Sequence, residues 1–356
     1  ENLMRGLREY LKKYSWGNAR WDDLVAILEN SSGRQLEEWS RMWVKEAGMP
    51  VITPVITGED GYRISFREDD TAGTLRHWPQ TLKTMVITAS DTVTADLEPA
   101  ERDSYITTAD RPLCIIPDIS GRAYGTFMLD SISAEYLLTN IAGFSDPLLK
   151  GIIWINLYEN LVNGTIRPSG FYSAATRDLQ GITDLQLRNY LSGRLSSVWW
   201  NYMTGEERAA RAAEAEAMLT AKMVSAESPA EKRSWFGTLR NITVTPEGLK
   251  YLASLWKTGE LPGQAGPGGP LAASVKLSED ELCTLALTLA LKGYPEAGSI
   301  IAQQRTRIYG KERLERFDFV IPAVSQDAAV RDAFFESLRD PANREREPWV
   351  LEALGY

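Results

Sequence analysis

The chain has 356 residues, of which 44% are hydrophobic and 24% charged, and its formal net charge is −9. This composition excludes a largely disordered chain, and the length predicts two or three domains. The negative charge argues against nucleic acid and against an anionic membrane as partners, because no run of Lys and Arg opposes it.

Three helices are predicted at the start of the chain, over residues 3–14, 22–29 and 36–44. Gly17 and Asn18 follow the first helix, and Gly33 follows the second, as residues that end helices do. The apolar side chains at helical spacing are Leu3, Leu7, Leu11, Tyr14, Leu36, Trp39, Trp43 and Val44.

From Val51 the pattern changes to short strands: VITPVI, GYRISFRE, TMVITAS and TVTADLE. Short strands at close spacing with polar turns predict a small antiparallel β-sandwich of about eighty residues. A strand over residues 113–116, a turn around Asp118 and Gly121, and a strand over residues 124–129 predict a β-hairpin that closes the sheet.

After Asp130 the predicted elements are helices. One covers residues 152–161 and stops at Asn163 and Gly164. Many helices joined by short turns predict antiparallel pairs in a solenoid-like domain, and hence a multidomain α+β fold. Four capping boxes support the helix starts: Thr183 with Gln186, Thr204 with Glu207, Ser228 with Glu231, and Ser278 with Glu281. Pro229 and Pro246 suit first-turn positions.

The segment ELPGQAGPGGP, residues 260–270, interrupts the helices. We interpret it as a mobile loop inside the helical domain, and the alternative is a domain boundary at this point. The longest apolar run, CTLALTLALKG, is too short to span a bilayer.

The residues that usually perform catalysis are scarce. The chain has one histidine, His77, and two distant cysteines, Cys114 and Cys283, which we interpret as buried free thiols. A zinc site would have to consist mostly of carboxylates, which is unusual, and no G-x-S-x-G elbow or Gly-rich phosphate loop is present. We therefore expect no catalytic residue, no metal ligand and no cofactor in this chain.

Five stretches occur in an informative order: REYLKKYSWGNARWDDL, SGRQLEEWSRMWVKEAGMPVI, IIPDISGRAYGTFMLD, IIWINLYENLVNGTIRP and RFDFVIPAVSQDAAVRDAFFESL. Together they resemble the C-terminal half of gluzincin zinc aminopeptidases of the aminopeptidase N type. The resemblance implies terminal helices of an otherwise missing zinc-protease domain at 1–48, a β-sandwich domain at 49–130 and a superhelical domain at 131–356. The G-x-M-E-N and H-E-x-x-H motifs of that family are absent, and both ends look cut.

Two hypotheses for the function follow. The resemblance implies the non-catalytic C-terminal portion of a zinc metallo-aminopeptidase, which removes N-terminal residues from peptides. Such a portion would help to enclose the active-site cavity and bind peptide. It would be inactive alone, and zinc would belong to the parent protein. The alternative is a stand-alone helical-repeat scaffold that binds a protein partner. We favour the first, because a scaffold has no reason to begin with helices that match the end of a protease domain.

The expected partners are peptide substrates and the missing N-terminal and zinc domains. If the zinc domain covers the first helices, Leu3, Leu7, Leu11, Trp39 and Trp43 should leave an exposed apolar surface in this chain. The compartment is open, since three N-x-S/T sequons can occur by chance, and we expect the cytoplasm.

Arg313 and Arg316 are the candidate substrate-binding residues. They lie in KERLERFDFVIPAV, which resembles the stretch of the family's helical domain where basic side chains face the cavity and can meet a peptide's C-terminal carboxylate. Residues three apart share a helix face, and arginine pairs well with carboxylates. The alternative is an ordinary salt-bridged helix face, with Glu312 and Glu315 as the partners.

Overall fold

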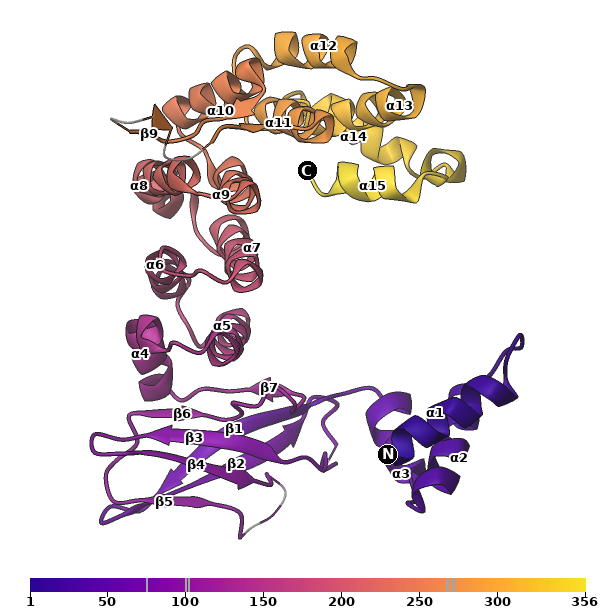
Figure 1. Ribbon diagram of the computed structural model, residues 1–356, viewed down its shortest axis with the longest axis vertical. Coiled ribbons are helices and arrows are strands. Elements are labelled where there is room, and N and C mark those ends of the chain that lie inside the picture. The colour runs from indigo at the N-terminus through magenta and orange to yellow at the C-terminus, as the bar shows by residue number, and fades with distance from the viewer. Residues whose placement is uncertain (75, 100, 102, 267–268, 271–272) are drawn as a thin grey trace. The chain divides into compact units, whose positions relative to one another are not determined.

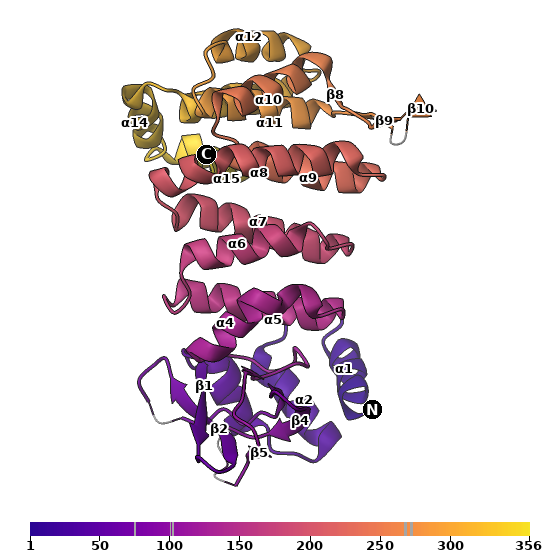
Figure 2. The ribbon, with the colours of Figure 1, turned by 90° about the vertical axis from the view of Figure 1, so that its left-hand side faces the viewer.

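Figure 1 and Figure 2 show the computed structural model of the chain, which describes residues 1–74, 76–99, 101, 103–266, 269–270 and 273–356. The chain divides into two compact units, Glu1–Arg167 and Pro168–Tyr356. Short helices come first, then a small β region, then a large helical part, so the predicted multidomain α+β class is confirmed. The three domains drawn at 1–48, 49–130 and 131–356 stay a prediction.

Helices open the first unit, as predicted. Helix α1 covers Asn2–Lys13, α2 covers Trp21–Ser32, and α3 covers Glu37–Ser40 and continues as a π-helical turn, η1, over Arg41–Lys45. Gly33 ends α2 in the left-handed conformation, with φ of 71°. Helices α1 and α2 pack closely at Gly6. A Cβ atom at this position would lie only 2.7 Å from the side chain of Leu28, so glycine allows the close approach.

Two sheets follow, and their strands enclose an apolar core. Strands β5, β2, β1 and β7 form one sheet in that order, and β4, β3 and β6 form the other. Their bounds are β1 Pro50–Thr57, β2 Tyr62–Asp70, β3 Leu82–Ile87, β4 Thr92–Leu97, β5 Ile106–Thr108, β6 Cys114–Ile116 and β7 Thr126–Phe127. The core side chains are Ile52, Ile64, Phe66, Leu82, Val86, Leu97, Ile106, Ile115 and Phe127. All pairings are antiparallel except that of β1 with β7.

The predicted hairpin over residues 113–129 is wrong. Both strands exist, but β6 pairs with β3 and β7 pairs with β1, so the chain crosses from one sheet to the other. Buried Asp118 explains the crossing, because its carboxylate accepts the backbone N–H of Lys83 at 3.1 Å. The backbone N–H of Ile119 also donates to the carbonyl oxygen of Lys83 at 2.8 Å. These contacts hold the segment after β6 on β3, so it does not turn back on itself.

Two helices complete the first unit: α4 over Ser131–Asn140 and α5 over Pro147–Val162, with a 3₁₀ turn, η2, over Ile141–Gly143 between them. Asn163 and Gly164, with φ of 78° at the glycine, stop α5 as predicted. The fully buried side chain of Asn160 donates to the carbonyl oxygen of Phe127 at 2.8 Å and accepts the N–H of Leu129 at 2.9 Å. This amide therefore fixes α5 against the end of β7.

The second unit is a succession of helices that pack against their neighbours (Figure 1, Figure 2). They are α6 Pro168–Leu179, α7 Leu185–Asn201, α8 Gly205–Ser225, α9 Pro229–Ile242, α10 Pro246–Thr258, α11 Glu279–Leu291, α12 Ala297–Arg307, α13 Lys311–Val320, α14 Ala328–Ser337 and α15 Glu347–Leu354. Short 3₁₀ turns cover Ile321–Val324 and Pro341–Arg344. No helix of the described residues is both long enough and apolar enough to cross a membrane.

The interruption at 260–270 lies inside the second unit. Its described ends form short strand pairs: β8 Glu260–Leu261 with β11 Val275–Lys276, and β9 Ala265–Gly266 with β10 Gly269–Pro270. Residues 267 and 268, also part of the predicted mobile loop, lie outside the described residues.

The helix starts test the predicted caps one by one. Both directions of the capping box form at Thr204 with Glu207 and at Ser278 with Glu281, and Pro229 and Pro246 stand in first turns. Ser228 caps α9, but Glu231 pairs with Arg188 at 3.1 Å. The cap at Thr183 is wrong: Asp184 accepts the N–H of Leu187 at 2.8 Å, because its carboxylate lies one residue closer to the helix.

Candidate functional site

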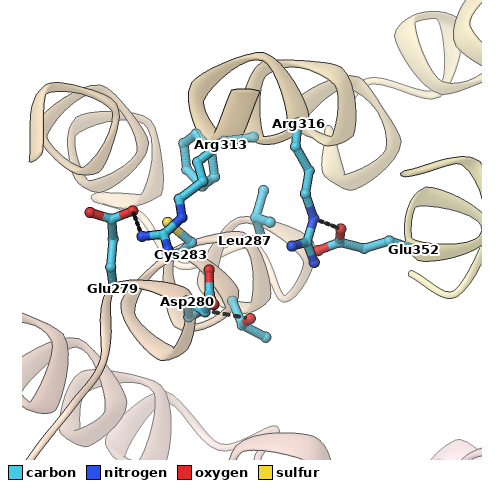
Figure 3. Close-up of a pocket in the computed structure, with 9 residues that line it drawn as sticks. Glu279, Asp280, Cys283, Leu287, Arg313, Arg316 and Glu352 are labelled. Carbon is cyan, nitrogen blue, oxygen red and sulfur yellow. Dashed lines mark hydrogen bonds and ion pairs between the residues drawn. The ribbon is translucent and has the colours of Figure 1, made fainter. Parts of the chain in front are cut away.

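The candidate arginines lie on α13. They are three residues apart and line the same small pocket, between α13, the start of α11 and α15 (Figure 3). The shared face expected from the spacing is therefore present, whereas the substrate-binding role stays a prediction. The side chains that line the pocket are Glu279, Asp280, Cys283, Thr284, Leu287, Arg313, Arg316, Phe317 and Glu352.

Burial of one face of α13 presents the arginines. Phe317 and Val320 are buried, while the side chains of Arg313 and Arg316 are 59% and 47% exposed. Phe317 also lines the pocket, beside the arginines. An apolar ring beside two cations lowers the local dielectric, which strengthens ionic contacts there.

Each arginine already has a carboxylate partner from another helix. Nη1 of Arg313 donates to Glu279 at 3.0 Å, and Nε of Arg316 donates to Glu352 at 2.5 Å (Figure 3). The predicted alternative partners were wrong. Glu312 pairs with Arg346 at 3.1 Å and Glu315 with Lys311 at 3.6 Å.

Three charged groups of the pocket have pKa values shifted in favour of their charged forms. Hydrogen bonding to Glu279 raises the pKa of Arg313, and hydrogen bonding to Glu352 raises the pKa of Arg316. The pKa of Glu279 is lowered by the backbone N–H of Tyr309 and then by Arg313. The acidic side chains that line the pocket with the two guanidinium groups are Glu279, Asp280 and Glu352.

The arginines retain unused hydrogen-bond donors. Within the described part of the chain, Nε and Nη2 of Arg313 and both terminal nitrogens of Arg316 make no hydrogen bond. A guanidinium has five N–H donors in a fixed planar arrangement that matches a carboxylate. The pocket thus has donors for an anionic group besides the partners it already holds.

Burial keeps the two cysteine thiols in the protonated form. Burial raises the pKa of Cys283 to about 11, and burial also raises the pKa of Cys114, which is fully buried in β6. Since the thiolate is the reactive form, the raised pKa values lower the reactivity of both thiols at neutral pH. Cys114 is buried as predicted, whereas Cys283 is only partly buried. Cys283 lies beside the arginines in the pocket, which its apolar sequence context did not indicate.

The zinc implied by the family resemblance finds no ligand set here. Among the described residues, no group of three or more His, Cys, Asp and Glu side chains lies close enough together to hold a metal ion. His77 is an exposed loop residue. No step of zinc chemistry can therefore be assigned to these residues.

Exposed apolar side chains cluster on the first helices. Leu3, Leu11 and Trp39 are exposed as expected, at 58%, 68% and 44%. Two expected members are only partly exposed, Leu7 and Trp43. The Trp43 ring packs against two other rings, with centroid distances of 5.1 Å to Trp78 and 6.0 Å to Tyr124. Further exposed members, which the helical stripes did not indicate, are Met4 and Trp16.

Sequence reasoning missed the carboxylates of the pocket. Glu279 and Asp280 follow the cap residue Ser278, so their place in a first helical turn was readable, but not their distance from α13. Glu352 had no signal, because 36 residues separate it from Arg316.

Comparison with known proteins finds relatives that are named aminopeptidase or tricorn protease-interacting factor. No protein-family model matches the chain. Aminopeptidase N of Streptomyces lividans is 27% identical over 177 residues, which is 45% of this chain and 21% of the relative. Tricorn protease-interacting factor F2 of Thermoplasma volcanium is 29% identical over 171 residues, 47% of this chain and 20% of the relative. Aminopeptidase M1-B of Oryza sativa is 35% identical over 75 residues, 20% of this chain and 9% of the relative.

The matched region of the two longer alignments spans about one fifth of each relative. The predicted resemblance is confirmed at that extent, and it makes the chain related to peptidases. The chain is similar to part of an aminopeptidase N-like protein.

Proposed function

We propose that this chain is the non-catalytic C-terminal portion of a zinc metallo-aminopeptidase. Its role is to help enclose the active-site cavity and to bind the peptide whose N-terminal residue is removed. In the parent protein the zinc would activate water and polarise the scissile carbonyl group. The residues of this chain would hold the other end of the peptide.

The observation that carries this proposal is the pair of arginines in one pocket. Arg313 and Arg316 present unused N–H donors side by side in a chain whose relatives are named aminopeptidases. A peptide's C-terminal carboxylate is a planar anion that two guanidinium groups can bind with several charge-assisted hydrogen bonds. A free carboxylate is also what a cleavable peptide carries at the end opposite its N-terminus.

The exposed apolar side chains of α1 to α3 support the partner assignment. Leu3, Leu11 and Trp39 lose favourable burial while exposed, and a missing zinc domain would cover them. The N-terminal and zinc domains of the parent are therefore proposed as partners, with peptides as the substrate class.

The test measures peptide binding by this chain directly. Tetra-alanine with a free carboxylate and tetra-alanine amide are titrated by calorimetry into the chain and into the Arg313→Ala and Arg316→Ala variants. Each variant should bind the acid about tenfold more weakly, because a hydrogen bond to a charged group contributes about 1.5 kcal/mol or more. Binding of the amide should not change.

Arg305→Ala is the matched control, because Arg305 also pairs with a carboxylate, Asp318 at 2.7 Å, but does not line the pocket. Equal losses for acid and amide, or losses in the control as well, would contradict carboxylate recognition.

A further inference from the structure

The pocket between the arginines is nearly full. Its free space is about 30 Å³, room for one or two water molecules. The terminal residue of a peptide is several times larger. If a peptide binds there, one side of the pocket must move.

Glu279 forms a fixed side of the pocket. Its carboxylate accepts two hydrogen bonds at 3.0 Å, one from Nη1 of Arg313 and one from the backbone N–H of Tyr309. It also lies in the first turn of α11, where the helix dipole favours a negative charge. Three separate interactions therefore keep Glu279 in place.

Glu352 forms a side that is held less firmly. Within the described residues its carboxylate has one hydrogen bond, to Nε of Arg316 (Figure 3). It belongs to α15, a helix of 8 residues that buries Val350 and Ala353 but leaves Leu351 and Leu354 more than half exposed. Moving α15 breaks the one hydrogen bond to Glu352, whereas moving the start of α11 breaks both hydrogen bonds to Glu279.

We propose that Glu352 is an internal ligand of Arg316 that closes the pocket, and that a peptide's C-terminal carboxylate takes its place. This inference rests on the proposed function. The charges favour such an exchange: with Glu352 present, three carboxylates face two guanidinium groups, and a fourth would be repelled. Once Glu352 has left, the remaining four charges balance, and Arg316 regains all its donors.

The Glu352→Gln variant of the full chain tests the exchange. Glutamine keeps the size of the side chain but removes the charge that competes for Arg316. Tetra-alanine acid should bind about threefold to fivefold more tightly, the upper range for a partly exposed ion pair. Tetra-alanine amide should bind as before. Cys283, which lines the same pocket, should react faster with N-ethylmaleimide, while fully buried Cys114 should stay unreactive.

Glu312→Gln is the matched control. Glu312 also lies on α13 and pairs with Arg346, next to α15, but neither residue lines the pocket. This variant should bind the acid as the unchanged chain does. Equal tightening in both variants would overturn the inference, because it would reflect a looser α15 alone.

The outcomes separate this inference from the function on which it rests. If Arg316→Ala weakens acid binding but Glu352→Gln leaves it unchanged, the closure by Glu352 is wrong and the carboxylate site stands. If neither the unchanged chain nor Glu352→Gln distinguishes acid from amide, the carboxylate site itself is wrong. Binding of the acid that is detectable only in Glu352→Gln would support both.

Discussion

The two units satisfy their backbone polar groups in different ways. In the first unit the long strands β1 and β2 pair along their whole length, from Pro50 opposite Asp70 to Thr57 opposite Arg63. In the second unit each helix ends with carbonyl groups that have no partner within the helix. At several of these helix ends, basic side chains from neighbouring segments supply the missing donors.

Two lysines show the arrangement. Lys232 of α9 is 1% exposed and donates to the carbonyl oxygens of Met223, Val224 and Pro262, at 2.8, 3.0 and 2.9 Å. Lys292, next to the end of α11, donates to Arg240, Asn241 and Thr243 at 2.8, 2.8 and 2.7 Å. Arg208 of α8 donates likewise to Trp199 and Met203 at the end of α7.

The two units differ in whether their stability depends on contacts that are distant or near in sequence. A sheet joins residues that are distant in sequence, so its order depends on the whole sandwich. In the helical unit each helix packs mainly on helices that are near it in sequence, which brings its stability closer to a sum of local terms. Local damage should therefore spread differently in the two units.

Lys232→Met should produce the largest effect. Methionine fills similar space but leaves three buried carbonyl groups without a donor, which should cost about 3 to 4 kcal/mol. Hydrogen exchange read by mass spectrometry should show lost protection in α8 and α9 and unchanged protection in β1 and β2. Lys257→Met is the control, because the exposed Lys257–Glu296 pair contributes less than about 1 kcal/mol. An equal loss of hydrogen-exchange protection in β1 and β2 would contradict this difference between the units.

Gly248→Ala should destabilise the turn between α9 and α10. A Cβ atom there would lie 2.0 Å from Oε2 of Glu216, the carboxylate that accepts the N–H groups of Val244 and Thr245. We expect a loss of about 2 kcal/mol in urea denaturation, despite alanine's better helix propensity. Gly237→Ala in α9 has nothing within 4 Å of the new methyl group and should stabilise by up to about 1 kcal/mol. Equal signs for the two variants would contradict this account.

Asp70→Asn should give the smallest effect, in the first unit. Hydrogen bonding from Arg76, at 2.6 Å, lowers the pKa of Asp70 below its ordinary value of 3.8. A carboxylate with a lowered pKa in the folded state stabilises above its ordinary pKa, and this contribution is lost as the pH falls further. Arg76 also pairs with Glu46 at 2.7 Å, so the contact joins η1 to the sandwich.

The measurement for Asp70 is urea denaturation, followed by circular dichroism at pH 7 and pH 3. The variant should unfold at lower urea than the unchanged chain at pH 7, and the difference should shrink at pH 3. Asp69→Asn, which removes an exposed pair with Arg67, should unfold as the unchanged chain does at pH 7. A difference that grows on acidification would reverse the assigned sign.

Local patterns in the sequence were sufficient for most elements. Helices α1, α2 and α5 and strands β1 to β4 follow from apolar periodicity and from residues such as Gly33 and Gly164 that end helices, because these signals act within one or two turns. The same short range explains the caps at Thr204 and Ser278. It also explains why the spacing alone placed Arg313 and Arg316 on one face.

Only the tertiary structure decided which elements meet. The strands at 114–116 and 126–127 were readable, but their assignment to two different sheets depends on Asp118 reaching Lys83, 35 residues away. The partners of Arg313 and Arg316 were unreadable for the same reason, since Glu279 and Glu352 approach them through packing of separate helices. Periodicity reports which face of an element is buried, whereas the partner of a side chain depends on contacts between segments distant in sequence.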